Sequence, residues 1–348
     1  MQKISRYTRR IILVLLVSSL LMVVLLLIFT QRPAGPGGRL LVTLDEGIPH
    51  ALYWLEIASG ELQPLHVDRA YQFELSPDGK QVAYSGSDGT NSHIYVAGLD
   101  LLNPQAVSSG PRDSDPHWSP DGTQIVFTRS VPYRSALFLY DLESGEERQL
   151  TEFENALEAD WSPDGARIIF TTSRDGFQEL YTMSPDGRGW RRMTENDLQN
   201  DLQASYSPDG KHIAYMTNYS VGDGTGEIWL MDADGSQQRR LTHNDADDGS
   251  PIWSPDNTKI AFTVSYVSSN PAADIFIYDV AAGAARQITH QPGLDYSPAW
   301  SPDSQWIAYV SKRDTTGGLY LMRPDGSDDH LLLAHDPYRI RSFIWIPS

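Results

Sequence analysis

A short turn motif recurs six times along the chain and constrains the fold more than any other feature. The clearest copy is Trp118-Ser119-Pro120-Asp121-Gly122. Proline pre-sets φ, the Ser and Asp side chains bond the local backbone, and Gly or Asn accepts the left-handed conformation that closes a tight hairpin. The copies begin at Ser76, Ser119, Ser162, Ser207, Ser254 and Ser301, at spacings of 43, 43, 45, 47 and 47 residues. A motif at nearly constant spacing predicts a repeat architecture.

Each repeat contains four short β-strand patterns and no convincing helical period. In the second repeat the first pattern ends at Trp118, and the others cover residues 124–128, 136–141 and 148–151. A unit of about 45 residues with four strands is typical of one blade of a β-propeller. The sequence therefore predicts an all-β fold.

The two ends of the repeat region complement each other. Residues 38–65 align without a gap on residues 123–150 and supply three strands without the first. Residues 342–347 copy an inner strand, with its Trp and Pro, and the given sequence ends one residue later. We therefore predict a seven-bladed β-propeller over 39–348, closed by one C-terminal and three N-terminal strands. Six blades are the alternative if the terminal strands do not pair. Closure would remove open sheet edges.

The segment before the repeats predicts a membrane anchor. Residues 1–10 form a short basic cytoplasmic tail, and residues 11–29 carry no charge. Nineteen residues at 1.5 Å per residue reach about 30 Å, enough to cross a bilayer core. A cleaved signal peptide is the alternative, but no small-residue cleavage pattern follows. Residues 30–38 read as a Pro/Gly linker. The basic tail predicts a single-pass protein of the cell membrane, with the N-terminus in the cytoplasm and the propeller outside it, periplasmic or extracellular.

The repeat also resembles a known family. The segment IWLMDADGSQQRRLT at 228–242, followed by PIWSPD at 251–256, is similar to the WD-related repeat of TolB-like β-propellers. Residues 180–187 and 319–326 repeat its first half. The resemblance covers residues 39–348 and implies the propeller fold. The resemblance does not point to one function, because such propellers occur in cell-envelope proteins, in prolyl-oligopeptidase-like enzymes and in lyases.

Composition and the missing motifs exclude several classes of function. The formal charge is −18, and four cations lie in the first ten residues, so the rest of the chain is more acidic still. Such a body repels phosphate backbones, and we expect no nucleic-acid partner. There is no cysteine, and no nucleophile elbow, P-loop or dinucleotide fingerprint occurs. We therefore expect no nucleotide and no cofactor. The Asp-Gly stretches at 232–235 and 325–329 lack the further ligands of a calcium loop, so no metal site is expected.

Two recurring residue types have mainly structural interpretations. The aromatic series (Trp118, Trp161, Tyr206, Trp253, Trp300, Trp345) could form a stacking ring for a ligand, but we expect it to fill the space between blades. An aspartate stands five residues earlier in four units (Asp113, Asp201, Asp248, Asp295). It could line a cation-binding face, yet such residues more often bond backbone N–H groups in a loop.

The candidate ligand-binding residues are three histidines and two of these aspartates. His243, His290 and His335 each follow the outermost strand of a blade and so should emerge on one face, where Asp248 and Asp295 recur. Equivalent rim positions should lie more than about 10 Å apart at four strands per blade, whereas metal ligands approach to about 2 Å. A shared site would need loops that fold toward the axis, and no catalytic residue is assigned.

These observations favour a non-enzymatic, membrane-tethered, extracytoplasmic propeller that acts as a scaffold. Its partner would be a protein or an envelope polymer, bound through the loops around the centre of the ring. A rigid ring presents such loops without reorganising, which lowers the cost of binding. The alternative is a polysaccharide-active, lyase-like enzyme with a His and carboxylate site on one face.

Overall fold

The computed structural model describes residues 36–46, 48–65, 67, 69–195, 199–219, 225–266, 272–313, 316–336 and 339–346. The chain divides into two compact units, Met1–Gly37 and Gly38–Ser348. The predicted anchor at 11–29 lies outside the described residues. Within the described ranges, no helix has both the length and the apolar character that crossing a membrane requires.

The described part of the second unit contains 28 β-strands in groups of four, six of them consecutive in the sequence and one that combines β28 with β1, β2 and β3. The first fourteen are β1 (Arg39–Glu46), β2 (Ile48–Glu56), β3 (Glu61–Pro64), β4 (Ala70–Leu75), β5 (Gln81–Ser87), β6 (Ser92–Gly98), β7 (Gln105–Ala106), β8 (Asp113–Trp118), β9 (Gln124–Val131), β10 (Arg134–Asp141), β11 (Glu147–Gln149), β12 (Leu157–Trp161), β13 (Ile168–Thr172) and β14 (Glu179–Met183). The others are β15 (Arg191–Arg192), β16 (Gln199–Tyr206), β17 (His212–Tyr219), β18 (Glu227–Asp232), β19 (Arg239–Arg240), β20 (Asp247–Trp253), β21 (Lys259–Tyr266), β22 (Ala272–Asp279), β23 (Ala284–Gln287), β24 (Gly293–Trp300), β25 (Ile307–Arg313), β26 (Thr316–Met322), β27 (His330–Ala334) and β28 (Ile340–Ile346).

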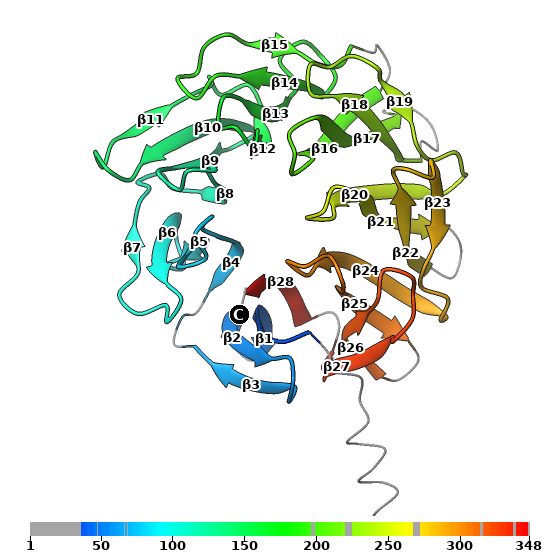
Figure 1. Ribbon diagram of the computed structural model, residues 1–348. Helices are drawn as coiled ribbons and strands as arrows, with labels where there is room; N and C mark the ends of the chain where they lie inside the picture. Colours follow the sequence, from blue (N-terminus) through cyan, green and yellow to red (C-terminus); the bar gives the residue numbers. More distant parts are fainter. Residues whose placement is uncertain are drawn as a thin grey trace, which may run out of the picture. The chain divides into compact units, whose positions relative to one another are not determined.

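Within the second unit the sheets stand around a common centre (Figure 1). Five sheets hold four strands each, and two further groups of four, β20–β23 and β24–β27, are joined by the single parallel pair Ala273–Leu294. The strands nearest the centre are β4, β8, β12, β16, β20, β24 and β28 (Figure 1). The all-β architecture of four-stranded sheets predicted from the repeat is thus confirmed.

The two ends of the second unit meet in one sheet. β28 pairs antiparallel with β1 from Arg39–Ile346 to Thr43–Ser342 and, after a register shift, at Leu44–Ile340, and β1 pairs in turn with β2 and β2 with β3. The sheet therefore takes one strand from the C-terminal end and three from the N-terminal end, as the alignment of residues 38–65 predicts. Counted this way, the described strands form seven four-stranded sheets, not six.

The turn motif makes the same hydrogen bonds in all six copies. The Ser hydroxyl donates to the Asp carboxylate two residues later at 2.6–2.8 Å. The residue after Asp donates its N–H to the Ser carbonyl at 2.8–2.9 Å. That fourth residue has φ between 59° and 72° in every copy, whether it is Gly, Asn257 or Ser304. The motif thus joins the first and second strands of each unit through a left-handed residue.

The hydrophobic core lies between neighbouring sheets. One cluster combines Ala83, Ile94 and Val96 with Trp118 and Phe127 of the next sheet. The predicted role of the aromatic series is confirmed, because all six rings are 5–8% exposed. Each indole N–H also donates to a backbone carbonyl of the preceding sheet at 3.0–3.3 Å: Trp118 to Glu74, Trp161 to His117, Trp253 to Ser205, Trp300 to Ile252 and Trp345 to Ala299.

Candidate functional site

The innermost strands share an irregularity three residues before the aromatic position. One residue in each of six strands has φ between 49° and 57°, and the pairing register shifts there. These residues are Gln72, Asp115, Glu158, Gln203, Ser250 and Ser297. Left-handed conformations are unfavourable for residues other than glycine. Six copies in the same place indicate a bulge that belongs to the repeat and that other interactions stabilise.

Hydrogen bonds between neighbouring sheets supply that stabilisation. Gln72 Oε1 accepts from the backbone N–H of Asp115 at 3.2 Å. Glu158 accepts from Gln203 at 2.9 Å, and Gln203 accepts from Ser250 at 2.8 Å. An innermost strand has one unpaired edge, whose N–H groups face away from its own sheet. The side chains of one sheet therefore satisfy the free edge of the next sheet.

A second set of bonds lies next to the aromatic position. Glu74 Oε2 accepts from the N–H of Trp118 at 2.7 Å, and Asp160 Oδ2 accepts from the N–H of Tyr206 at 3.1 Å. These carboxylates replace water at the edge amides and place negative charge at the centre of the ring.

At the two positions one and three residues before the aromatic, acidic residues occur in only three of the seven innermost strands of the described part. Glu74, Asp115, Glu158 and Asp160, which we call the acidic arc, come from β4, β8 and β12. The corresponding pairs in the other four strands are uncharged: Gln203 and Ser205, Ser250 and Ile252, Ser297 and Ala299, and Ser342 and Ile344. One side of the centre is therefore anionic and the other is neutral and partly apolar.

His117 lies within the acidic arc. Its Nδ1 is 3.7 Å from Glu74 Oε2 and its Nε2 is 3.5 Å from Asp115 Oδ1. The three side chains keep 30–41% of their surface exposed, so solvent reaches them. Burial opposes the charge on the imidazole, but Glu74 and Asp115 outweigh it and hold the pKa of His117 well above 6.5. The two carboxylates therefore favour the protonated form of His117.

The surroundings shift the pKa values of the acidic-arc carboxylates in opposite directions. Burial raises the pKa of Asp160 to about 6, although His117 and the Tyr206 N–H act against this shift. Burial also raises the pKa of Glu158. Burial favours the neutral form of Asp115 as well, but the His117 hydrogen bond outweighs it and the pKa of Asp115 is lowered. The arc therefore gains negative charge as the pH rises through 6.

The histidines predicted from the sequence lie in the connections between sheets. His243 precedes β20, His290 precedes β24 and His335 precedes β28. The first two are exposed and His335 is half-buried, with Nδ1 3.1 Å from the carbonyl oxygen of Asp336. Among the described residues, no group of three or more His, Asp or Glu side chains could hold a metal ion. Ligand binding by these histidines stays a prediction.

The predicted aspartates are buried. Asp248 and Asp295 are 0% and 1% exposed, and Asp248 Oδ2 accepts from Asn244 Nδ2 at 2.7 Å. The related Asp113 accepts from the backbone N–H of Gly110 at 2.9 Å, which is the loop contact expected from the sequence. Asp201 instead accepts from the Thr217 hydroxyl at 2.6 Å. A ligand role for Asp248 and Asp295 also stays a prediction.

Sequence reasoning missed the acidic arc, because it considered the aromatic position and not its neighbours. The signal was present: the residues one and three positions before that aromatic are charged in the second and third repeats and uncharged in the last three. What the sequence did not indicate is that a bulge turns both positions toward the next sheet.

Comparisons with known proteins agree with this architecture. Residues 72–222 match the family model of the TolB beta propeller domain. No protein in the comparison with curated sequences matches the chain.

Several solved structures share the fold. TolB from Acinetobacter baumannii is 23% identical, with a TM-score of 0.54, over 90% of this chain and 81% of that one. An oligogalacturonate lyase in complex with manganese is 16% identical, with a TM-score of 0.63, over 87% of both chains. The β-propeller domain of the trilobed protease from Pyrococcus furiosus, described as having an open velcro topology, is 17% identical, with a TM-score of 0.64, over 87% of this chain and 94% of that one. The match over residues 72–222, the repeat and the ring of four-stranded sheets together make this chain similar in fold to TolB-like β-propellers.

Proposed function

We propose that this protein is a non-enzymatic scaffold that is tethered to the membrane outside the cytoplasm and binds a partner through the centre of its propeller. The TolB-like fold supports a protein partner, and an envelope polymer is the second class of partner that the acidic surface would admit. The binding determinant is the acidic arc. It would engage a cationic segment, such as a loop or tail of the partner that carries lysine or arginine.

The observation that carries this proposal is the uneven distribution of charge on the innermost strands. The four carboxylates of the acidic arc and His117 lie at the positions one and three residues before the aromatic on β4, β8 and β12, while Ile252, Ala299 and Ile344 stand at corresponding positions elsewhere. Edge amides need a hydrogen-bond acceptor but not a charged one, as Gln203 shows by accepting from Ser250. The hydrogen bonds to the edge amides therefore do not by themselves require acidic residues at the four positions of the acidic arc. A net charge of −18 on the whole chain would add long-range attraction for a cationic partner.

A charged probe tests the proposal directly. A decapeptide with four lysines should bind the purified full-length protein, and its glutamate counterpart should not. Glu74→Gln and Asp115→Asn should each weaken binding about two- to fivefold, since a half-exposed ion pair contributes about 0.5–1 kcal/mol. Both changes keep a side-chain oxygen. Glu61→Gln on the outermost strand β3 is the matched control and should change nothing. Isothermal calorimetry at two salt concentrations measures both effects; equal affinities for the two peptides would contradict the proposal.

The membrane tether rests on the sequence of residues 11–29. Cell fractionation should place the full-length protein in the membrane pellet after alkaline extraction, and a variant without residues 1–38 in the soluble fraction. If the full-length protein is released by alkali, the anchor is wrong and the scaffold is soluble.

The enzymatic alternative has one specific observation in its favour. His117 lies between two carboxylates, in a fold shared with an oligogalacturonate lyase. A lyase would release an unsaturated product from an acidic polysaccharide, detectable by ultraviolet absorbance. Turnover that His117→Gln abolishes would favour this alternative over the scaffold.

A further inference from the structure

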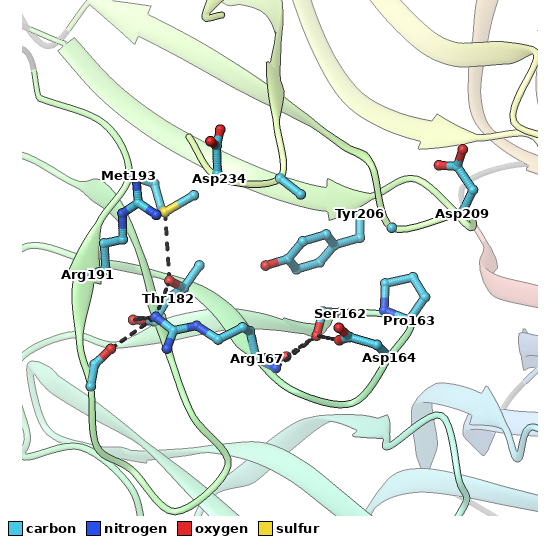
Figure 2. A pocket seen from close by; sticks show the side chains of 13 residues that line it. Ser162, Pro163, Asp164, Arg167, Thr182, Arg191, Met193, Tyr206, Asp209 and Asp234 are labelled. Atoms are coloured by element: carbon cyan, nitrogen blue, oxygen red, sulfur yellow. Dashed lines mark hydrogen bonds between the residues drawn. The ribbon is translucent and has the colours of Figure 1, made fainter. Parts of the chain in front are cut away.

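A cavity lies beside Tyr206, whose backbone N–H donates to Asp160 of the acidic arc. It has a volume of about 690 Å³ and opens between the sheets β12–β15 and β16–β19, beside the Ser-Pro-Asp turns. Figure 2 shows the ring of Tyr206 projecting among Arg167, Pro163 and the residues of the two neighbouring turns. The volume falls in the range of small-molecule sites.

Because the fold repeats, this cavity can be compared with the corresponding cavity at the preceding junction between sheets. The preceding junction, between β8–β11 and β12–β15, has a corresponding cavity of about 350 Å³. Its lining includes Gln124 and Trp161, where the larger cavity has Arg167 and Tyr206. The enlarged cavity therefore coincides with the one junction at which the repeat's tryptophan is replaced by tyrosine. It also reaches outward to Arg191 and Met193, which the smaller cavity does not.

Arg167 brings an unpaired positive charge to this cavity. Its Nη2 donates to the Thr182 hydroxyl at 2.8 Å and to the carbonyl oxygens of Thr182 and Gly189 at 3.3 and 3.0 Å. No ion pair of Arg167 occurs among the described residues. In the smaller cavity, Gln124 instead donates to the Asp141 carboxylate at 2.9 Å. A half-buried guanidinium without a carboxylate is uncommon, because burial of charge is unfavourable unless the charge is paired.

The acidic side chains of the lining are engaged elsewhere. Asp164 accepts from Ser162 and from the N–H of Ala166 within its own turn, and Asp209 pairs with Lys211 at 2.9 Å. Asp234 accepts from Ser236 at the exposed rim. These carboxylates hold turns and do not pair with Arg167, whose Nε and Nη1 make no hydrogen bond among the described residues and could donate to an anion from outside.

Tyr206 adds a hydrogen-bond donor. Its hydroxyl has no hydrogen-bond partner among the described residues, although its ring is 93% buried. Burial and the neighbouring Asp160 raise the pKa of Tyr206 to about 12, so the hydroxyl keeps its proton. Each of the five tryptophans in the equivalent position uses its N–H on a backbone carbonyl, whereas the Tyr206 hydroxyl makes no such bond among the described residues.

We propose that this cavity is a binding site for a small organic carboxylate. The carboxylate accepts hydrogen bonds from the Arg167 guanidinium and the Tyr206 hydroxyl, and the apolar part of the ligand packs on Met193 and Pro163. Arginine suits this role because its planar fork matches a carboxylate. The site uses other side chains than the acidic arc, although the Tyr206 N–H donates to Asp160 of the arc, and it does not depend on the proposed scaffold function.

Two matched pairs of probes test the site and distinguish the sources of the carboxylate. N-acetyl-leucine and N-acetyl-leucinamide represent a peptide terminus, and glucuronate and glucose represent a sugar acid. Ligands of about 12 heavy atoms reach dissociation constants of about 1 mM. At least one acid should bind the full-length protein at this level, and its neutral counterpart about tenfold more weakly. If neither acid binds better than its neutral counterpart, the proposal is overturned.

Three variants locate the binding. Arg167→Gln installs the residue of the preceding repeat and should weaken the acid about tenfold or more. Tyr206→Phe removes one oxygen, leaves the packing in place and should weaken the acid about threefold to tenfold. Arg134→Gln, on the β9–β10 hairpin, is the control and should bind as the wild type does. If Arg167→Gln fails to fold by circular dichroism, Tyr206→Phe decides: wild-type affinity of that variant would remove the site.

Discussion

One aspartate position shows how the same residue is stabilised in different ways from repeat to repeat. Asp113 pairs with Arg129 at 2.7 Å, and Asp201 accepts from Thr217. Asp248 Oδ2 accepts from the Asn244 amide, but its Oδ1 is buried without a hydrogen-bond partner among the described residues, and the Thr242 and Asn244 side chains offset the effect of burial only in part. Burial therefore raises the pKa of Asp248 to about 6. An unpaired buried carboxylate destabilises the folded state when it ionises.

This predicts that stability depends on pH at Asp248. The folded-state pKa lies above the usual value of 3.8, so the folded protein holds this proton more tightly than the unfolded chain does. The contribution of Asp248 to the free energy of unfolding is therefore most favourable below about pH 4 and is lost as the pH rises to about 6. Asp248→Asn cannot ionise, and we expect it to be more stable than the wild type at pH 8 by about 1–3 kcal/mol, but not at pH 4.

Urea unfolding at both pH values measures the difference. Asp245→Asn, at an exposed position of the same loop, is the control and should shift stability by less than about 0.5 kcal/mol at either pH. A difference between Asp248→Asn and the wild type that is the same at pH 4 and pH 8 would contradict the burial argument.

At the scale of the elements, the innermost strand carries most of the contacts between sheets. Its tryptophan fills the junction and donates to the preceding strand, as Trp300 does to Ile252 at 3.2 Å. Its bulge turns polar side chains toward the next edge, as Gln203 does toward Ser250. Buried apolar surface and hydrogen bonds therefore stabilise the same junction between sheets. Loss of either should weaken the packing of two neighbouring sheets.

We expect Trp300→Phe to destabilise the fold by about 1–3 kcal/mol, because it leaves the Ile252 carbonyl without a donor and opens space in the junction. The melting temperature should fall by about 2–6 °C in a domain of this size. Tyr133 provides the contrast, since it is 99% exposed at the tip of the β9–β10 hairpin. Tyr133→Ala should leave the melting temperature unchanged within about 1 °C. Equal melting temperatures for both variants would remove the proposed role of the indole.

At the scale of the whole second unit, the ring depends on one pairing between distant parts of the chain. β28 bonds to β1 along six residue pairs, and the Trp345 indole donates to Ala299 of the neighbouring sheet at 3.0 Å. β28 also buries Ile340, Phe343 and Ile346. Each such side chain contributes about 1.5–3 kcal/mol on burial, so the last strand stabilises the fold by an amount comparable to the net stability of a domain.

Removal of residues 340–348 should therefore abolish cooperative unfolding or lower the melting temperature by more than about 10 °C. Removal of residues 347–348 alone is the matched control and should leave the melting curve unchanged. Differential scanning calorimetry on the purified proteins compares them. If the longer truncation melts within about 2 °C of the full chain, closure between β28 and β1 does not stabilise the ring.

The sequence alone determined the repeat, the four strands of each unit and the pairing of its two ends. This follows from local chemistry: the Ser-Pro-Asp turn bonds only to itself, and alternating apolar residues define strands wherever they occur. The aromatic position was likewise predictable, because Trp118 and its equivalents are too large to be exposed in every repeat.

Only the tertiary structure decided where the charged and polar side chains meet. Glu74, His117 and Asp160 follow one another at intervals of 43 residues in the sequence and interact only because successive repeats are arranged around a common centre (Figure 1). The cavity at Tyr206 needs two sheets side by side, so its size could not be read from either repeat alone. The turns follow from hydrogen bonds within a few residues. The acidic arc and the cavity follow from contacts between neighbouring repeats, which no single repeat contains.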